Sequence, residues 1–147
     1  MEQHQRCPAV VIHCMDWRFR KHLNAFLDAR FPAGYDLISL AGGIKSLHED
    51  GISDTNVELK NLKLASSLHH PERIVLIQHE DCGAYGGSGQ FANFEAEHRF
   101  QEEELRKAML LLEEYFPQKI TEAHFIRLSG EVIPLAQAPE TQSVSPR

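Results

Sequence analysis

The sequence predicts an α/β fold with a mainly parallel central β-sheet and helices on both faces of that sheet. Two observations indicate this fold. Short apolar runs alternate along the chain with longer segments in which apolar residues recur at near-helical spacing. Residues that bind metals follow directly after two of the apolar runs. Alternating strands and helices are typical of parallel sheets, whose functional residues gather beyond the carboxyl ends of the strands.

The first third of the chain predicts a strand, a helix and a second strand. Residues 9–12 form an apolar run that predicts a buried strand. The helix follows, and Pro32 and Gly34 end its pattern. A second strand is predicted at Asp36–Leu40, ahead of the loop 41–43, where two glycines allow close approach to the backbone. The apolar residues that predict the helix are Phe19, Leu23, Phe26 and Leu27.

The middle of the chain predicts a longer helix and a third strand. Ser53 or Asp54 is expected to cap this helix, which runs to about His69 before Pro71. The third strand is predicted at residues 73–78. The apolar residues of the helix are Val57, Leu59, Leu62, Leu64 and Leu68.

The last part of the chain predicts a lid, a long helix and a closing pair of strands. Residues 83–96 are rich in glycine at their start and have no strong period, so we expect a loop that folds over the crevice. A helix is predicted at residues 95–115, with its charged residues on a solvated face. Strands are predicted at residues 123–128 and 131–135. The helix is predicted from Phe100, Leu105, Ala108, Met109, Leu112 and Phe116.

Length and composition predict one domain. The chain has 147 residues, of which 42% are hydrophobic, enough for a single core, and we place that domain at residues 1–135. Residues 136–147 have the composition of a disordered tail. The net charge of −6 and the lack of a basic cluster argue against nucleic acid or a membrane as partner. Three widely spaced cysteines and no secretory signal favour a cytoplasmic location.

Two predicted strand ends carry the residues of a metal site. Cys14 follows the first strand, and His79 and Cys82 follow the third. Since neighbouring parallel strands end at one crevice, these side chains are expected to meet there. Two thiolates and one imidazole suit Zn²⁺, and three protein ligands leave a position open for catalysis. The alternatives are two buried cysteines acting as small apolar residues, a redox pair, and a hydrogen-bonded histidine.

Asp16 and Arg18 form a candidate dyad beside this site. If the extended conformation continues past Cys14, both side chains lie on one side, where arginine clamps the carboxylate with two charge-assisted hydrogen bonds. A purely structural ion pair is the alternative. Gly42, Gly43 and Gly83 are candidate substrate-binding residues, through backbone N–H groups or the space they leave, although ordinary loop geometry also accounts for them.

At these residues the sequence resembles the β-class carbonic anhydrases, which have Cys-x-Asp-x-Arg after the first strand and His-x-x-Cys after a later one. The likeness extends to the loop 41–43, to Gly83 and to the turn at residues 129–130, and so covers residues 8–135. With thirteen residues before Cys14, the chain looks like a small member with a short N-terminal segment. The five matching positions are Cys14, Asp16, Arg18, His79 and Cys82.

The resemblance implies a zinc enzyme that reversibly hydrates CO2 to bicarbonate through a zinc-bound hydroxide, in a homodimer or higher homo-oligomer. It brings in two roles for Asp16: orienting the zinc-bound water while Arg18 holds it, or binding zinc as a fourth ligand in a closed, resting site. Activity is expected to rise with pH because thiolate ligands make the bound water less acidic. Trp17 is expected at the sheet end or at a subunit interface, and His13, His48 and His98 are candidate proton carriers.

Two departures from the family pattern keep other functions open. Ser39 and Leu40 stand where many members have an Arg-Asn pair, which removes a cation and an amide near the crevice. Leu40 would suit a more apolar substrate, so hydrolysis of carbonyl sulfide or carbon disulfide on the same zinc site is one alternative. A non-catalytic zinc-binding module, with Asp16 as the fourth ligand, is the other.

Overall fold

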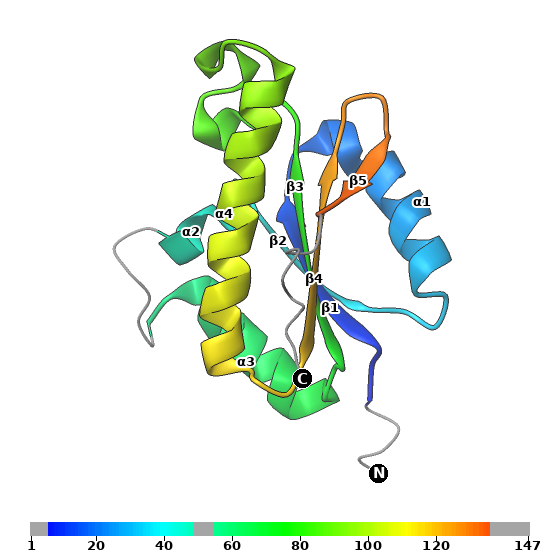
Figure 1. Cartoon of the computed structure of the whole chain (residues 1–147). Coiled ribbons are helices and arrows are strands. Elements are labelled where there is room, and N and C mark those ends of the chain that lie inside the picture. Colours follow the sequence, from blue (N-terminus) through cyan, green and yellow to red (C-terminus); the bar gives the residue numbers. More distant parts are fainter. Residues whose placement is uncertain (1–5, 49–54, 136–147) are drawn as a thin grey trace, which may run out of the picture.

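A computed structural model of the chain describes residues 6–48 and 55–135, which form one five-stranded sheet with helices on both sides (Figure 1). The strand order is β2-β1-β3-β4-β5; the first four strands are parallel, and β5 is antiparallel to β4. The predicted mainly parallel α/β fold is therefore confirmed. The strands are β1 (Ala9–Cys14), β2 (Asp36–Leu40), β3 (Arg73–His79), β4 (Ile120–Ile126) and β5 (Val132–Pro134).

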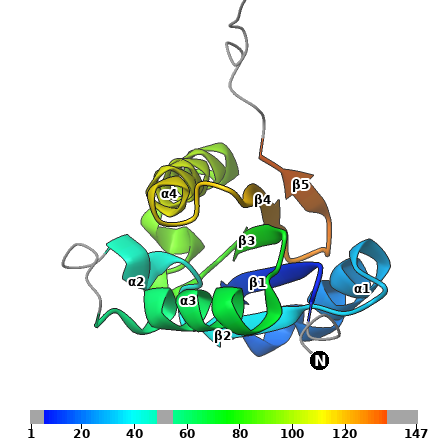
Figure 2. The same ribbon diagram turned by 90° about the horizontal axis from the view of Figure 1, so that it is seen from below.

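Helices cover the two faces of the sheet unequally. Helix α1 (Arg20–Arg30) lies on one face, and α2 (Lys45–His48), α3 (Val57–His69) and α4 (Phe94–Tyr115) lie on the other (Figure 2). The short helix α2, directly after the loop 41–43, is absent from the sequence prediction. Among the described residues, no helix combines the length and the apolar character needed to cross a membrane.

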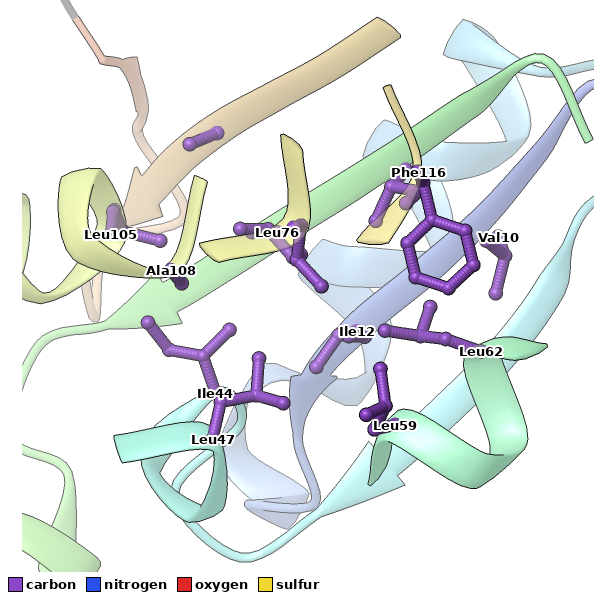
Figure 3. Packing of buried hydrophobic residues seen from close by; sticks show 13 residues of the cluster. Val10, Ile12, Ile44, Leu47, Leu59, Leu62, Leu76, Leu105, Ala108 and Phe116 are labelled. Atoms are coloured by element: carbon purple, nitrogen blue, oxygen red, sulfur yellow. The ribbon is translucent and has the colours of Figure 1, made fainter. Parts of the chain in front are cut away.

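The central strands have one apolar side chain after another because both faces of the sheet are covered. All six residues of β1 are buried, and successive side chains enter opposite cores. Val10 and Ile12 pack with α2, α3 and α4 (Figure 3), whereas Ala9 and Val11 pack with α1. This burial fixes the positions of β1 and β3, whose carboxyl ends bear the candidate ligands.

Several element boundaries differ from the predictions. β1 continues two residues beyond the apolar run and ends at Cys14, and β3 ends at His79. The side chain of Asn56 caps α3, where its Oδ1 accepts a hydrogen bond of 2.9 Å from the backbone N–H of Leu59. The predicted caps, Ser53 and Asp54, lie outside the described residues. β2 is confirmed at its predicted bounds.

The apolar patterns of α3 and α4 only partly match the buried surfaces. In α3, Leu59 and Leu62 are buried, but Val57, Leu64 and Leu68 are more than half exposed. In α4, Leu105, Ala108 and Leu112 are buried, Met109 is partly buried and Phe100 is exposed; Phe116, which caps the carboxyl end of the helix, is also buried. Glu97 and Glu104, two charged residues of α4 that the prediction placed in solvent, are buried instead, and so is Gln101. They face the end of the sheet that contains the candidate site.

The region after β3 is more ordered than the predicted loop. It contains two 3₁₀ turns, η3 (Gly83–Tyr85) and η4 (Ser88–Gln90), before α4 begins at Phe94, where Asn93 caps the helix. At the end of the described chain, β4 begins three residues before its predicted start and ends at Ile126. The predicted tail, 136–147, lies outside the described residues.

Candidate metal centre

Three side chains from two adjacent strand ends meet at one point. Cys14 is the last residue of β1, His79 is the last residue of β3, and Cys82 follows after a short turn. The two Sγ atoms and one imidazole nitrogen all lie within 4.8 Å of one another. All three residues are at least nine-tenths buried. This convergence was predicted from the sequence. It occurs because β1 and β3 are hydrogen-bonded neighbours in the parallel sheet.

The ring of His79 is oriented so that one nitrogen faces the two sulfurs. Its Nδ1 lies 2.7 Å from the carbonyl oxygen of Glu80; since a carbonyl only accepts, Nδ1 bears the hydrogen and Nε2 presents a lone pair. The ring of Phe19 packs against that of His79 at 4.3 Å between centroids. His79 Nε2 is buried and has no hydrogen-bond partner among the described residues. The hydrogen bond from Nδ1 to a backbone carbonyl, which leaves Nε2 for the metal, is typical of histidines that bind metals.

The electrostatics of the two cysteines also favour a cation. A hydrogen bond from Cys82 lowers the pKa of Cys14, and His79 and the backbone N–H of Gly42, 3.4 Å from Cys14 Sγ, act in the same direction. The hydrogen bond to Cys14, burial and the negative charge of Cys14 raise the pKa of the Cys82 thiol. Two buried thiolates repel each other unless a cation lies between them. The donor set of two sulfurs and one nitrogen, with the unpartnered His79 Nε2, therefore fits a zinc ion.

Asp16 and Arg18 form a bidentate ion pair next to these ligands. Arg18 Nη2 lies 2.7 Å from Asp16 Oδ2, and Arg18 Nε lies 3.1 Å from Oδ1. The pairing matches the prediction, but its predicted cause is wrong. The chain does not stay extended: Asp16 caps the 3₁₀ turn η2 (Trp17–Phe19), and its Oδ1 accepts a hydrogen bond of 2.9 Å from the backbone N–H of Arg18.

The ion pair keeps Asp16 charged close to the candidate ligands. Hydrogen bonds from the Arg18 side chain, opposed in part by desolvation, lower the pKa of Asp16. Asp16 Oδ2 lies 3.9 Å from His79 Nε2, too far for a hydrogen bond. A carboxylate oxygen therefore lies beside the point where the ligand atoms converge.

A pocket of about 530 Å³ opens over this point. The candidate ligand Cys14, the dyad and the exposed Trp17 contribute to its wall, as do two of the three predicted glycines, Gly42 and Gly83. Gly42 adopts φ +82°, and a Cβ there would lie 2.9 Å from Lys45 Cβ, so only glycine suits the position. Gly43 is buried and does not line the pocket, and a Cβ there would clash with the side-chain amide oxygen of Gln78.

Comparison with known proteins identifies the family. The family described as "Putative carbonic anhydrase" matches residues 4–135. The chain belongs to this carbonic anhydrase family. It is 25% identical over 135 residues to the uncharacterized protein RC0076 of Rickettsia conorii. The matched region covers 88% of this chain and 73% of that protein.

Solved carbonic anhydrases share the fold. The Streptococcus mutans enzyme is 17% identical and has a TM-score of 0.63, over 90% of this chain and 84% of that one. A tetrameric β-carbonic anhydrase of Sordaria macrospora is 14% identical and has a TM-score of 0.64, over 90% and 82%. The β-carbonic anhydrase CafA of Aspergillus fumigatus is 14% identical and has a TM-score of 0.52, over 92% and 79%.

Four other residues that the sequence analysis singled out do not line the pocket of this carbonic anhydrase family member. His13 is buried and bonded to the carbonyl oxygen of Cys14 at 2.7 Å, and desolvation lowers its pKa. His48 contacts the carbonyl oxygen of Glu104 at 3.0 Å, and His98 stacks on Phe94. None of the three histidines is among the described residues that line the pocket, and neither is Leu40.

Sequence reasoning missed two residues that support the site. Gln78 is buried in β3; its Nε2 donates to the carbonyl oxygen of Gly42 and its Oε1 accepts from the backbone N–H of Ile44, both at 3.1 Å. It thereby fixes the glycine loop next to Cys14. Asp81 binds Arg18 and lines the pocket. The only sequence signal for Asp81 is a carboxylate between His79 and Cys82, at a position that the family pattern leaves unspecified.

Proposed function

We propose that the chain is a zinc-dependent carbonic anhydrase that reversibly hydrates CO2 to bicarbonate. The observation that supports this most directly is the convergence of Cys14, Cys82 and the unpartnered Nε2 of His79 beneath a pocket. These three residues would hold the zinc ion. Zinc bound there would supply a Lewis acid that lowers the pKa of a coordinated water to about 7. Membership of the carbonic anhydrase family supports the same reaction.

Asp16 and Arg18 would orient the reacting water. Asp16 is ionised because Arg18 lowers its pKa, so its Oδ2, beside the ligand atoms, is available as a hydrogen-bond acceptor. Arg18 fixes the direction of that carboxylate through two donors. While Arg18 holds Asp16 in this way, Asp16 is not a metal ligand. This pairing favours an open site over the closed, non-catalytic arrangement.

We also propose that the chain assembles as a homodimer or a higher homo-oligomer. Met15 and Trp17, beside the candidate ligands, are 64% and 82% exposed, so the predicted packing of Trp17 at the sheet end does not occur within one chain. Large apolar side chains at this exposure are typical of surfaces that contact a partner. The Sordaria macrospora relatives are tetrameric, which supports homo-oligomerisation.

Stopped-flow measurement of CO2 hydration between pH 7 and 9 tests the proposed function. The protein must first be shown to contain one zinc ion per chain. We expect hydration that rises with pH and disappears in Cys82→Ser. A fully zinc-loaded protein that hydrates no CO2 at any pH in this range would overturn the proposal.

Turnover of carbonyl sulfide, measured on the same samples, shows whether the protein prefers carbonyl sulfide to CO2. The structure offers no observation in favour of a sulfur substrate, since Leu40 is not among the residues that line the pocket. We therefore expect CO2 to be preferred. A higher kcat/KM for carbonyl sulfide would replace the anhydrase proposal with the hydrolase alternative.

A further inference from the structure

The guanidinium group of Arg18 binds two carboxylates through different edges. Its Nε and Nη2 bind Asp16, as described above. On the other edge, Nη1 donates to Asp81 Oδ2 at 3.0 Å and Nη2 donates to the carbonyl oxygen of Asp81 at 2.9 Å. Different nitrogens bind the two carboxylates, Nε and Nη2 for Asp16 and Nη1 for Asp81, so both are bound at once; the second hydrogen of Nη2 serves the Asp81 carbonyl oxygen. Asp81 therefore does not compete with Asp16 for Arg18.

Asp81 is itself held from two sides. Its backbone is in the left-handed region, at φ +61°, and its Oδ1 accepts a hydrogen bond of 2.8 Å from the backbone N–H of Ser88. Its own backbone N–H donates to Glu97 Oε2 at 2.6 Å. Glu97, in α4, is 2% exposed and also accepts from Ser88 Oγ at 2.8 Å. The position of Asp81 is thus fixed by the turn η4 and by α4.

The contact between Arg18 and Asp81 adds little to stability. The two side chains are 33% and 36% exposed, and ion pairs with this much solvent contact contribute little to the free energy of folding. A second anchor nevertheless limits the rotation of a long, flexible side chain. Arg18 bound only to Asp16 would move together with Asp16; Arg18 bound also to Asp81 is a fixed support for it.

We propose that Asp81 is a positioning residue that fixes Arg18, so that Arg18 keeps Asp16 beside the metal ligands rather than on the metal. This inference rests on the proposed zinc site and hydration reaction. Glu97 and Ser88 act one step farther out, by fixing Asp81. The turn η4 and α4 are in this way coupled to the orientation of the carboxylate at the metal.

Asp81→Asn tests this role with little disturbance of the backbone. Asparagine tolerates the left-handed conformation as aspartate does. The substitution therefore removes the charge and keeps the main-chain hydrogen bonds of residue 81 with Arg18 and Glu97. The protein is loaded with Co²⁺ in place of zinc, because the visible spectrum of Co²⁺ reports its ligands independently of turnover. Asp28→Asn is the matched control, since Asp28 is bonded to Tyr35 Oη, outside the site.

In Asp81→Asn we expect the Co²⁺ spectrum to shift toward that of a site with four protein ligands. We also expect kcat/KM for CO2 to fall about tenfold, as expected for the loss of one charge-assisted hydrogen bond, and its pH profile to change. Asp28→Asn is expected to match the wild type in all three measurements. Ser88→Ala removes one outer contact and is expected to shift the spectrum in the same direction by less.

The outcomes separate the two proposals. Wild-type activity together with an unchanged spectrum and pH profile in Asp81→Asn would overturn the role of Asp81. An inactive wild type with a shifted spectrum in Asp81→Asn would support that role and reject the hydration reaction. If Asp81→Asn does not fold, Asp81→Gly decides on the same spectroscopic criterion, because glycine also adopts the left-handed conformation and lacks the carboxylate. A shift supports the role, and an unchanged spectrum overturns it.

Discussion

The candidate ligands and the carboxylates around Arg18 lie side by side but differ in burial. Cys14, His79 and Cys82 are 7%, 3% and 2% exposed. The side chains of Asp16, Arg18 and Asp81 are 15%, 33% and 36% exposed. Buried thiolates depend strongly on a compensating cation, whereas partly exposed ion pairs are screened by water. We infer that the first group determines whether metal binds and the second determines how the site is oriented.

The largest effect is expected when one of the buried candidate ligands is removed. In Cys82→Ser we expect zinc to be lost and CO2 hydration to fall below detection, because a hydroxyl does not replace a thiolate on zinc. Zinc content by elemental analysis and stopped-flow hydration are the measurements. Cys7→Ser is the matched control, since Cys7 Sγ contacts the carbonyl oxygen of Ala9 and is not in the cluster. Full zinc occupancy in Cys82→Ser would contradict the assignment of ligands.

Removal of Arg18 tests whether orientation is separable from metal binding. In Arg18→Ala we expect zinc to be retained and kcat/KM to fall about 100-fold, the size associated with a misplaced catalytic group. Because the Arg18 side chain lowers the pKa of Asp16, its loss raises that pKa. Activity is then expected to begin its decline at a higher pH as the solution is acidified. Zinc loss equal to that in Cys82→Ser would show that the two groups are not separable.

The buried carboxyl of Glu58 sharpens the comparison through its effect on the stability of the fold. Glu58, in α3, is fully buried; Ser46 Oγ donates to its Oε1, and its Oε2 has no hydrogen-bond partner among the described residues. Burial raises the pKa of Glu58 to about 7. A raised carboxyl pKa stabilises the fold at pH below about 4.5, and this contribution is lost as the pH rises through about 7.

The Glu58→Gln variant measures this contribution. Relative to the variant, the free energy of unfolding of the wild type is expected to fall by about 3 kcal/mol between pH 4.5 and pH 8. Chemical denaturation at both pH values gives the difference. The exposed Glu103 in α4 provides the control Glu103→Gln, for which no such change is expected. A constant difference between wild type and Glu58→Gln across this range would contradict the raised pKa.

The smallest effect on activity is expected at His98, which belongs neither to the candidate ligands nor to the residues around Arg18. His98 packs between Phe94 and Phe125, so His98→Phe keeps aromatic packing and removes the titratable ring. We expect kcat for CO2 hydration to stay within about twofold of the wild type, whereas loss of a proton-transfer group costs about 100-fold or more. A loss of that size, rescued by an added imidazole buffer, would identify His98 as a proton carrier.

The mainly parallel sheet and the convergence of the three candidate ligands were the most predictable features. The buried strands have unbroken apolar runs, and Cys14 and His79 lie two residues beyond those runs, at the strand ends. Placing both strands in one parallel sheet was therefore enough to bring these residues together. The α3 cap was not predictable in this way. Asn56, Ser53 and Asp54 are all good capping residues, and the sequence alone does not choose among them.

The support of the dyad was not predictable because it depends on tertiary contacts. Glu97 belongs to a charged stretch of α4 that the helical pattern places in solvent, yet it is buried against Asp81 and Ser88. The bend after Cys14 likewise depends on Asp16 capping a 3₁₀ turn, which the Asp16–Arg18 spacing does not reveal. Local sequence patterns report packing against the core and contain little information on contacts between polar side chains.

The separation of the ligands along the chain has a consequence for biosynthesis. Cys14 and His79 are brought together by the pairing of β1 with β3, which closes a long loop and is therefore slow compared with local helix formation. A nascent chain has all three candidate ligands in place only after Cys82 has left the ribosome and these strands have paired. Uptake of metal by a refolding chain would thus report the docking of β3 onto β1.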